Sequence, residues 1–469
     1  MSLTQSIAKN SAIQIFGKAA STILGLIAVA IMTRHLGVEK FGWYATATGF
    51  LQFVGIFSDF GFTIITAKML AEPNFDQQKL LNNLFTWRFI TAFVFQALAP
   101  IIFLFFPYPA EIKIAVAITS LSFFAISLNN IFIGYYQAKL QMFAQISGEV
   151  LGRIFLVLGL LFTTLANRGF IFTMGVITLA SIIYTFYLWQ KGPKVRFAFD
   201  RVISREIFHK IWPTAITVIL NAFYLQGDRV ILPLYVSQTD VGLYGAAYKI
   251  IDLAAQVTAM LMGIMMPLAA FAWSRNLAAE FKKAAQNSFD LIMFFLMPML
   301  AGILALARPI IALIAGPEFA ASANILRLLA LAIFGLALGN VFGYIALAIN
   351  RQKRAIGIYF FTAIFTTAAY LYFIPRYGIW GAAGAAIGAE VLAGLGLMIL
   401  VGESAKFFPK IFTFSKIIAA SAIMGWVIYK IQPQNILVSI LAGIGIYGLL
   451  VILLKIVSKQ TLAEVLRRD

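Results

Sequence analysis

The residues of this chain that could do chemistry are ionisable side chains placed inside long apolar stretches. An ionisable group at the centre of a lipid bilayer costs about 2.5–3.5 kcal/mol, so it normally faces a cavity or a partner. The set comprises Lys18, Asp59, Arg88, Glu149, Arg153, Asp228, Arg229, Lys249, Asp252 and Glu390. Each is a candidate for binding a charged ligand or for holding helices together.

The cations of this set are the predicted ligand-binding residues. Arg engages a phosphate through two parallel hydrogen bonds and Lys acts as a point charge, so both could contact an anionic headgroup. Lys18 and Asp59 are expected at similar depth in consecutive spans, which predicts that they pair. Arg88 could instead reach the surface from the end of its span. The predicted cationic cleft is lined by Lys18, Arg88, Arg153, Arg229 and Lys249.

The carboxylates are candidates for coupling transport to H⁺ or Na⁺. Glu390 is the most suggestive, because it lies in mid-span with no cation nearby in the sequence. Two charge pairs have a simpler explanation, since residues three or four apart on a helix can neutralise each other. These pairs are Glu149 with Arg153 and Lys249 with Asp252. The predicted coupling residues are Asp59, Glu149, Asp228 and Glu390.

Several kinds of site are excluded by composition. The chain has no cysteine and two histidines, so it offers no thiol nucleophile and no Cys-ligated or His-rich metal site. It also lacks the Gly-rich phosphate loop of ATP-driven machines. No cofactor and no metal are expected, and an electrical, ionic or substrate gradient must drive any transport. The predicted loops are too short for a glycosyltransferase or polymerase site, so no catalytic residue is expected.

The elements that position these residues are membrane-spanning helices. Of the 469 residues, 61% are hydrophobic and 12% are charged, whereas about 25% of residues are charged in soluble domains. The apolar stretches each last about 20 residues, the length of one bilayer crossing. We therefore predict an all-α integral membrane protein with about fourteen spans, at residues 11–32, 43–66, 84–106, 112–136, 147–166, 170–190, 211–235, 243–271, 289–315, 323–349, 355–374, 379–401, 411–431 and 435–457.

The distribution of Lys and Arg orients these spans. Most of them fall in the connections that lie on the same side as both termini, and fewer fall on the opposite side. The excess of positive charge marks the cytoplasmic side, so both termini are predicted to be cytoplasmic. The net charge of +18 is thereby explained without nucleic acid. The first apolar stretch is long and leads at once into another span, so we expect it to be retained rather than cleaved as a signal peptide.

Two short echoes indicate an internal repeat. Residues 41–45 read FGWYA and residues 241–245 read VGLYG, each just before or at the start of a span. Arg168-Gly169-Phe170 similarly corresponds to Tyr377-Gly378-Ile379. Each repeat holds an even number of helices, which predicts two parallel six-helix lobes around a central cleft. The predicted domains are 1–190 (spans one to six), a basic cytoplasmic linker 191–210, 211–401 (spans seven to twelve), and 402–469 with the last two spans and a cytoplasmic tail.

The sequence resembles a family of membrane exporters. The residues that carry the resemblance are Lys9-Asn10-Ser11, Phe57-Ser58-Asp59-Phe60-Gly61, and above all the run Thr33-Arg34-His35-Leu36-Gly37-Val38-Glu39-Lys40-Phe41-Gly42-Trp43-Tyr44. They resemble the polysaccharide biosynthesis flippases, including O-antigen and exopolysaccharide flippases, of the multidrug/oligosaccharidyl-lipid/polysaccharide (MOP) exporter superfamily.

The resemblance implies a flippase of a prokaryotic inner or plasma membrane. Its substrate would be a polyprenyl-diphosphate-linked oligosaccharide, carried by alternating access from the cytoplasmic to the outer leaflet. Membrane lipids, H⁺ or Na⁺, and polysaccharide polymerase machinery are the implied partners. An ion-coupled multidrug or small-molecule exporter of the same superfamily is the alternative.

Overall fold

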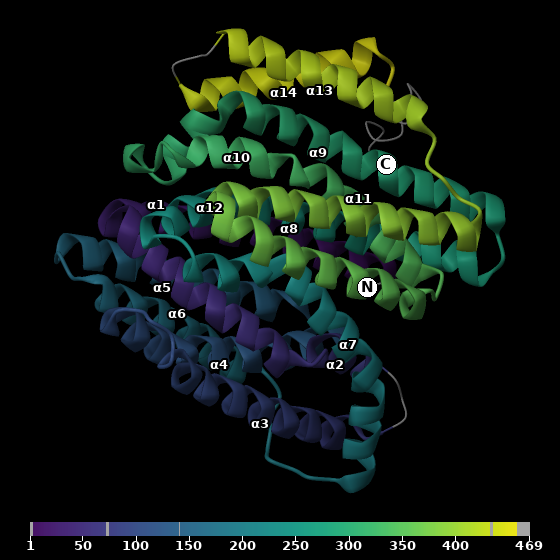
Figure 1. The fold of residues 1–469 in the computed structure, drawn as a ribbon. Helices are drawn as coiled ribbons and strands as arrows, with labels where there is room; N and C mark the ends of the chain where they lie inside the picture. Colours follow the sequence, from purple (N-terminus) through teal and green to yellow (C-terminus); the bar gives the residue numbers. More distant parts are fainter. Residues whose placement is uncertain (1–2, 72–74, 140, 432–434, 457–469) are drawn as a thin grey trace. The chain divides into compact units, whose positions relative to one another are not determined.

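The computed structural model describes residues 3–71, 75–139, 141–431 and 435–456. Regular structure in these ranges is helical throughout (Figure 1). The α-helices are α1 (Leu3–Asp59), α2 (Phe62–Ala71), α3 (Gln77–Phe103), α4 (Ala110–Ala138), α5 (Met142–Leu165), α6 (Phe170–Lys191), α7 (Arg201–Ile231), α8 (Gln238–Ser274), α9 (Ala278–Ile314), α10 (Ser322–Ala330), α11 (Ala332–Ala348), α12 (Gln352–Ala405), α13 (Ile411–Ile431) and α14 (Ile436–Leu453). Short 3₁₀ turns occupy Leu232–Leu234 and Pro317–Phe319.

The helices confirm a multi-pass membrane protein. Eleven of the described helices are long and apolar enough to cross a bilayer. Two of them, α1 and α12, are each divided into two arms by a glycine in non-helical backbone, Gly37 and Gly378. Counting these arms separately and adding the more polar 31-residue α7 brings the number of helical segments in the described chain to fourteen, in rough agreement with the expected number of spans.

Two predicted spans are interrupted. The second span, predicted as continuous over 43–66, breaks after Asp59 and resumes as α2 at Phe62. The break consists of Phe60 and Gly61, whose φ angles are 44° and 83°. A left-handed conformation is easy for glycine and unfavourable for phenylalanine, so the surroundings must hold Phe60 in place. The tenth predicted span is likewise divided, into α10 and α11.

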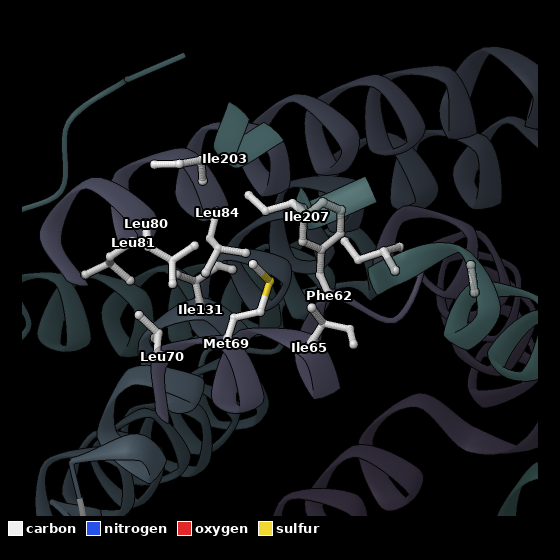
Figure 2. Packing of buried hydrophobic residues seen from close by; sticks show 12 residues of the cluster. Phe62, Ile65, Met69, Leu70, Leu80, Leu81, Leu84, Ile131, Ile203 and Ile207 are labelled. Atoms are coloured by element: carbon white, nitrogen blue, oxygen red, sulfur yellow. The ribbon is translucent and has the colours of Figure 1, made fainter. Parts of the chain in front are cut away.

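The structure has two compact units, residues 1–242 with 314–316, and residues 243–313 with 317–469. The first unit contains a core that joins α2, α3 and α4 to the first half of α7 (Figure 2). The apolar residues of α7 in this core recur every four positions, as expected for one buried helix face. The core comprises Phe62, Ile65, Met69, Leu70, Leu80, Leu81, Leu84, Ile131, Ile203, Ile207, Ile211 and Ala215.

The segment 192–200 between α6 and α7, here called the strap, is extended and lies along α3. Its alternate backbone N–H groups donate to polar side chains of α3, at 2.7–3.1 Å. These contacts explain the polar side chains near the start of α3: they accept hydrogen bonds from strap N–H groups that have no partner in regular secondary structure. The contacts are Arg196 N to Asn82 Oδ1, Ala198 N to Thr86 Oγ1, Asp200 N to Asn83 Oδ1, and Gln78 Nε2 to the carbonyl of Lys194.

In the same unit, the second arm of α1 crosses the start of α8 at two glycines. A Cβ placed on Gly42 would lie 1.8 Å from the carbonyl oxygen of Gln238, and one on Gly242 would lie 2.1 Å from that of Val38. Each glycine therefore faces the carbonyl four residues before the other glycine. Gly42 and Gly242 are the corresponding glycines of the echo between residues 41–45 and 241–245. Their reciprocal contact is what a local twofold relation between the repeats would produce.

The second unit is also held by close glycine contacts. A Cβ on Gly335 of α11 would lie 2.6 Å from the backbone of Glu390 in α12, and one on Gly394 would lie 2.8 Å from the carbonyl of Gly335. Small residues let spanning helices approach closely and gain van der Waals contact. Helices α13 and α14 pack side by side (Figure 1), and Tyr447 donates a hydrogen bond of 3.0 Å to the carbonyl of Phe294.

Candidate functional site

The structure groups the predicted site residues into separate clusters. Within the first unit, Lys18 and Arg153 lie near Glu149, Arg88 binds Asp59, and Arg229 follows Asp228. The second unit holds Lys249 and Glu390. No group of three or more His, Asp or Glu side chains that could hold a metal occurs in the described ranges.

The first cluster joins the first arm of α1 to α5. Lys18 Nζ lies 2.9 Å from Glu149 Oε1, and Ser21 Oγ donates to the same oxygen at 2.7 Å. Lys18 and Ser21 are three residues apart and therefore share one face of their helix. The Lys18 side chain remains 45% exposed, whereas that of Glu149 is 15% exposed. The cation is thus accessible from outside the protein while its partner is largely covered.

Arg153 belongs to this first cluster. It is exposed, it acts electrostatically on Glu149, and its Nη1 would lie 3.7 Å from a Cβ on Gly25 of α1. Next to Arg153 on α5, Gly152 accommodates Tyr184 of α6, since a Cβ there would lie 3.0 Å from the Tyr184 Cβ. Two accessible cations therefore flank one carboxylate, an arrangement able to receive an anion with more than one negative charge.

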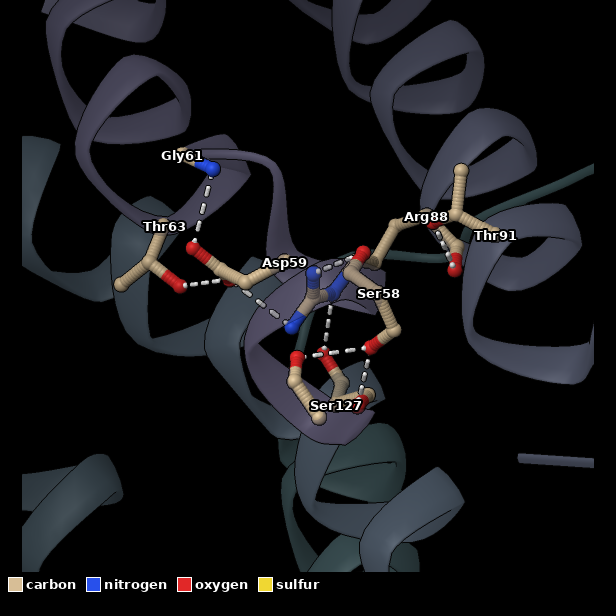
Figure 3. Close-up of polar contacts among 8 residues, drawn as sticks. Ser58, Asp59, Gly61, Thr63, Arg88, Thr91 and Ser127 are labelled. Atoms are coloured by element: carbon tan, nitrogen blue, oxygen red, sulfur yellow. Dashed lines mark hydrogen bonds and ion pairs between the residues drawn. The ribbon is translucent and has the colours of Figure 1, made fainter. Parts of the chain in front are cut away.

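Arg88 has a different setting, at the break between α1 and α2 (Figure 3). Its side chain donates hydrogen bonds of 2.9 Å to the carbonyls of Ser58 and Ser127 and lies 2.9 Å from Asp59 Oδ1. Arg88 is 1% exposed. It therefore caps the Ser58 carbonyl at the end of α1 and joins the break to the Ser127 carbonyl in the interior of α4.

Asp59, the last residue of α1, connects the Arg88 contacts to the residues that follow the break. Its carboxylate accepts a hydrogen bond from Thr63 Oγ1 at 2.6 Å and one from Gly61 N at 3.2 Å, as Figure 3 shows. One residue thus ends α1 and stabilises the start of α2. Together, Arg88 and Asp59 supply the surroundings that hold Phe60 in its unfavourable conformation.

The expected pair of Lys18 with Asp59 is wrong. Lys18 binds Glu149 and Asp59 binds Arg88. The expectation that Arg88 reaches the surface is also wrong, since Arg88 is buried. Both errors have one cause: the apolar sequence of a span does not show toward which neighbouring helix a charged side chain points. The expected neutralisation of Glu149 by Arg153 alone is replaced by a shared contact with Lys18 and Ser21.

Arg229 lies near the end of α7, beside the second arm of α1. Its Nη1 donates to Gln52 Oε1 at 2.8 Å, and its backbone N donates to the Asp228 carboxylate at 2.9 Å. A Cβ on Gly49 would lie 3.1 Å from the Arg229 Cβ, so the glycine permits this approach. Asp228 is fully buried. Arg229 is thereby held against the second arm of α1, the arm in which Gly42 meets the start of α8.

The second unit holds the remaining predicted residues. Lys249 and Asp252 are partly buried on α8. Glu390 is 8% exposed on the second arm of α12, against Gly335 of α11.

Polar neighbours of the charged groups were missed in the sequence. The side chains of Ser21 and Gln52 contact Glu149 and Arg229, whereas Ser58 and Ser127 contact Arg88 only through their backbone carbonyls. An isolated polar residue in an apolar span was the available signal, because such a residue must find a partner in the bilayer. The position of Tyr184 beside this cluster could not be predicted from the sequence, since tyrosine is common at membrane interfaces.

The helices and charged clusters define a multi-pass membrane protein with the fold of a transporter. The model of the polysaccharide biosynthesis protein family matches residues 31–324. The chain belongs to this family.

Individual proteins resemble this chain over most of its length, one in sequence and two in fold. The chain is 21% identical over 486 residues to the succinoglycan biosynthesis transport protein ExoT of Rhizobium meliloti (strain 1021), covering 98% of this chain and 94% of that protein. It matches the structure of the lipid II flippase MurJ in an inward closed conformation with a TM-score of 0.76 and 18% identity, covering 93% of this chain and 98% of that chain. An inward-facing multidrug resistance MATE family transporter of the MOP superfamily matches with a TM-score of 0.67 and 12% identity, covering 82% of this chain and 94% of that chain.

Proposed function

We propose that this protein is a flippase for a polyprenyl-diphosphate-linked oligosaccharide, which it moves from the cytoplasmic to the outer leaflet by alternating access. Family membership and the roles of two similar proteins, succinoglycan transport and lipid II flipping, support this function over catalysis. The observation that carries the proposal is the exposed pair of cations, Lys18 and Arg153, on membrane-spanning helices. A diphosphate supplies the matching charge.

Glu149 gives the proposed site a means of release. Its carboxylate competes with the substrate phosphate for Lys18, because it neutralises the ammonium charge and repels a second anion placed beside it. Protonation of Glu149, or cation binding to it, would free Lys18 for the substrate. Of the predicted coupling residues, Glu149 thus has the most direct connection to the ligand, whereas Asp59 is engaged by Arg88. Asp228 and Glu390 remain candidates for coupling.

The membrane potential supplies enough energy for this direction of transport. A headgroup carrying roughly two negative charges gains about 4–5 kcal/mol when it crosses 100 mV outward from a negative interior. An ion gradient acting through a carboxylate would add to this driving force.

The test is translocation of a fluorescent polyprenyl-diphosphate oligosaccharide in proteoliposomes. Lys18→Ala and Arg153→Ala should each lower the flipping rate by about 10–100-fold, the value of a charge-assisted hydrogen bond. Arg229→Ala is included because Arg229 was predicted to line the same cleft. Lys282→Ala is the matched control, since Lys282 is an exposed cation near the start of α9.

The outcomes separate the proposals. Flipping that survives all three substitutions would keep the function and reject the site. Absence of flipping together with extrusion of organic cations would favour the multidrug exporter, whose fold this chain shares.

A further inference from the structure

The strap presents an exposed aromatic and cationic surface. Its backbone is fixed to α3 through alternate N–H groups, so the intervening side chains, Phe197 and Phe199, project beside the helix. Their rings touch α3 residues, with centroid distances of 5.0 Å from Phe197 to Phe89 and 5.3 Å from Phe199 to Trp87. They nevertheless remain 65% and 68% exposed. Large apolar groups held in this way are matched to the edge of a lipid bilayer.

Cations border these rings. Lys194 and Arg196 of the strap and Arg201 and Arg205 of α7 are exposed. Among the described residues, no ion pair involves any of these four side chains.

The acidic residues nearby are already engaged. Asp200 accepts hydrogen bonds from Val202 N and Ile203 N at the start of α7, and Glu206 lies 3.5 Å from Lys210. The surface is therefore positive and uncompensated.

We propose that this surface, formed by Lys194, Arg196, Phe197, Phe199, Arg201 and Arg205, binds the phosphate headgroup of an anionic phospholipid at the membrane face that holds the strap. The cations contact the phosphate while the two rings lie among the upper parts of the acyl chains. Fixing the strap to α3 orders these groups before the lipid arrives, which lowers the entropic cost of binding. The bound lipid anchors the junction between α6 and α7 at a fixed depth.

The experiment measures lipid retained by the full-length protein. Detergent-purified protein is titrated with phosphatidylglycerol or phosphatidylcholine of equal chain length, and bound lipids are counted by native mass spectrometry. Wild type should prefer phosphatidylglycerol. The variant Lys194→Gln/Arg196→Gln/Arg201→Gln/Arg205→Gln should lose this preference by at least about tenfold, since each cation near anionic lipid contributes attraction.

A charge-matched control separates this site from general attraction. The variant Lys282→Gln/Lys283→Gln/Lys353→Gln/Arg354→Gln removes four exposed cations from the beginnings of α9 and α12. It should retain the preference of wild type. Equal loss in both variants, or no loss in the strap variant, would overturn the proposal.

Two further binding measurements test whether the site recognises both the phosphate and the acyl chains of the lipid. Phe197→Ser/Phe199→Ser should weaken phosphatidylglycerol binding without any change of charge, because the rings contact the acyl region. Millimolar inorganic phosphate should compete poorly, since it lacks an acyl chain. Displacement of phosphatidylglycerol by free phosphate at equal concentration, or retention unaffected by loss of both rings, would contradict a lipid site.

Discussion

At the scale of single residues, the charged side chains divide into two roles according to their exposure. Arg88 is buried and makes its contacts within the protein, while Lys18 keeps nearly half of its side chain exposed. A buried charge must be compensated internally, so Arg88 belongs to the stability of the break between α1 and α2. An exposed cation beside a covered carboxylate is instead available to a ligand.

Substitution of Arg88 should therefore destabilise the protein. Arg88→Met leaves the Asp59 carboxylate without its cation and removes the hydrogen bonds to the carbonyls of Ser58 and Ser127, and breaking a buried pair costs about 3–5 kcal/mol. A lowered midpoint of thermal unfolding in detergent is expected. Arg88→Met/Asp59→Asn should recover part of the loss, whereas Arg153→Gln should change the midpoint little. An unaltered midpoint in Arg88→Met would remove its structural role.

Substitution of Glu149 should affect ligand binding in the opposite sense to substitution of Lys18. Glu149→Gln removes the negative charge next to Lys18, so the polyprenyl-diphosphate ligand should bind about tenfold more tightly and turn over more slowly. Binding is measured by tryptophan fluorescence and turnover in proteoliposomes. Lys18→Gln/Glu149→Gln serves as the control and should lose the gain in affinity. Weaker binding by Glu149→Gln would contradict the proposed competition.

At the scale of elements, glycines decide how closely helices meet. The crossing of α1 and α8 has room for no Cβ on either side, because each glycine faces a backbone carbonyl of the other helix. Backbone cannot move aside as a flexible side chain can. The strap has a comparable constraint, since its N–H groups require the amide and hydroxyl side chains of α3.

Enlarging the glycines at the crossing should therefore impair folding or force the helices apart. Gly42→Val and Gly242→Val should each lower the yield of folded protein in detergent, measured by size-exclusion chromatography. Gly175→Val in α6 and Gly263→Val in α8 are matched controls, because a Cβ at either position meets no atom within 4 Å. Similar losses in crossing and control variants would show that helix propensity, rather than close approach, is responsible.

At the scale of the whole molecule, the proposed alternating access requires that contacts between the two predicted repeats form and separate. Thr46 Oγ1 donates to Gln238 Oε1 at 2.7 Å, next to the Gly42 crossing. This contact joins the second span to the start of the eighth, on the side predicted to face outward. A natural chain without cysteine makes the contact accessible to selective cross-linking.

Cross-linking at this contact should stop transport. In Thr46→Cys/Gln238→Cys, a short bifunctional thiol reagent should abolish flipping, because the two helices can no longer separate. A cleavable reagent should allow recovery on reduction. Each single cysteine variant, treated identically, should retain its activity. Unchanged flipping by the cross-linked protein would mean that this contact persists throughout the transport cycle.

The predicted orientation has a separate test in intact cells. Ala166→Cys lies at the end of α5, on the side predicted to be outside, and Ala279→Cys lies in the first turn of α9, on the side of the termini. A membrane-impermeant maleimide should label Ala166→Cys in intact cells and Ala279→Cys only after permeabilisation. The reverse pattern would invert the orientation and the assigned direction of transport.

The sequence alone determined that the chain crosses a membrane many times, and it predicted the approximate number and limits of the spans, since each uninterrupted apolar run is long enough for one bilayer crossing. It also predicts an internal repeat, because Gly42 and Gly242 stand at equivalent places in the echo of residues 41–45 and 241–245. Family membership followed from the Thr33–Tyr44 region. Each of these properties depends on residues close together in the chain or on composition, which a linear sequence contains in full.

Only the tertiary structure decided which charges meet. Lys18 binds Glu149 rather than Asp59, and Arg88 is buried at a helix break that hydropathy does not reveal. In an almost wholly apolar span, no periodic pattern states which face points to lipid and which to a neighbouring helix. The rotation of each helix is set instead by close packing at glycines and by the need of every buried polar group for a partner. These conditions are satisfied together, between residues distant in sequence, and therefore appear only in the folded chain.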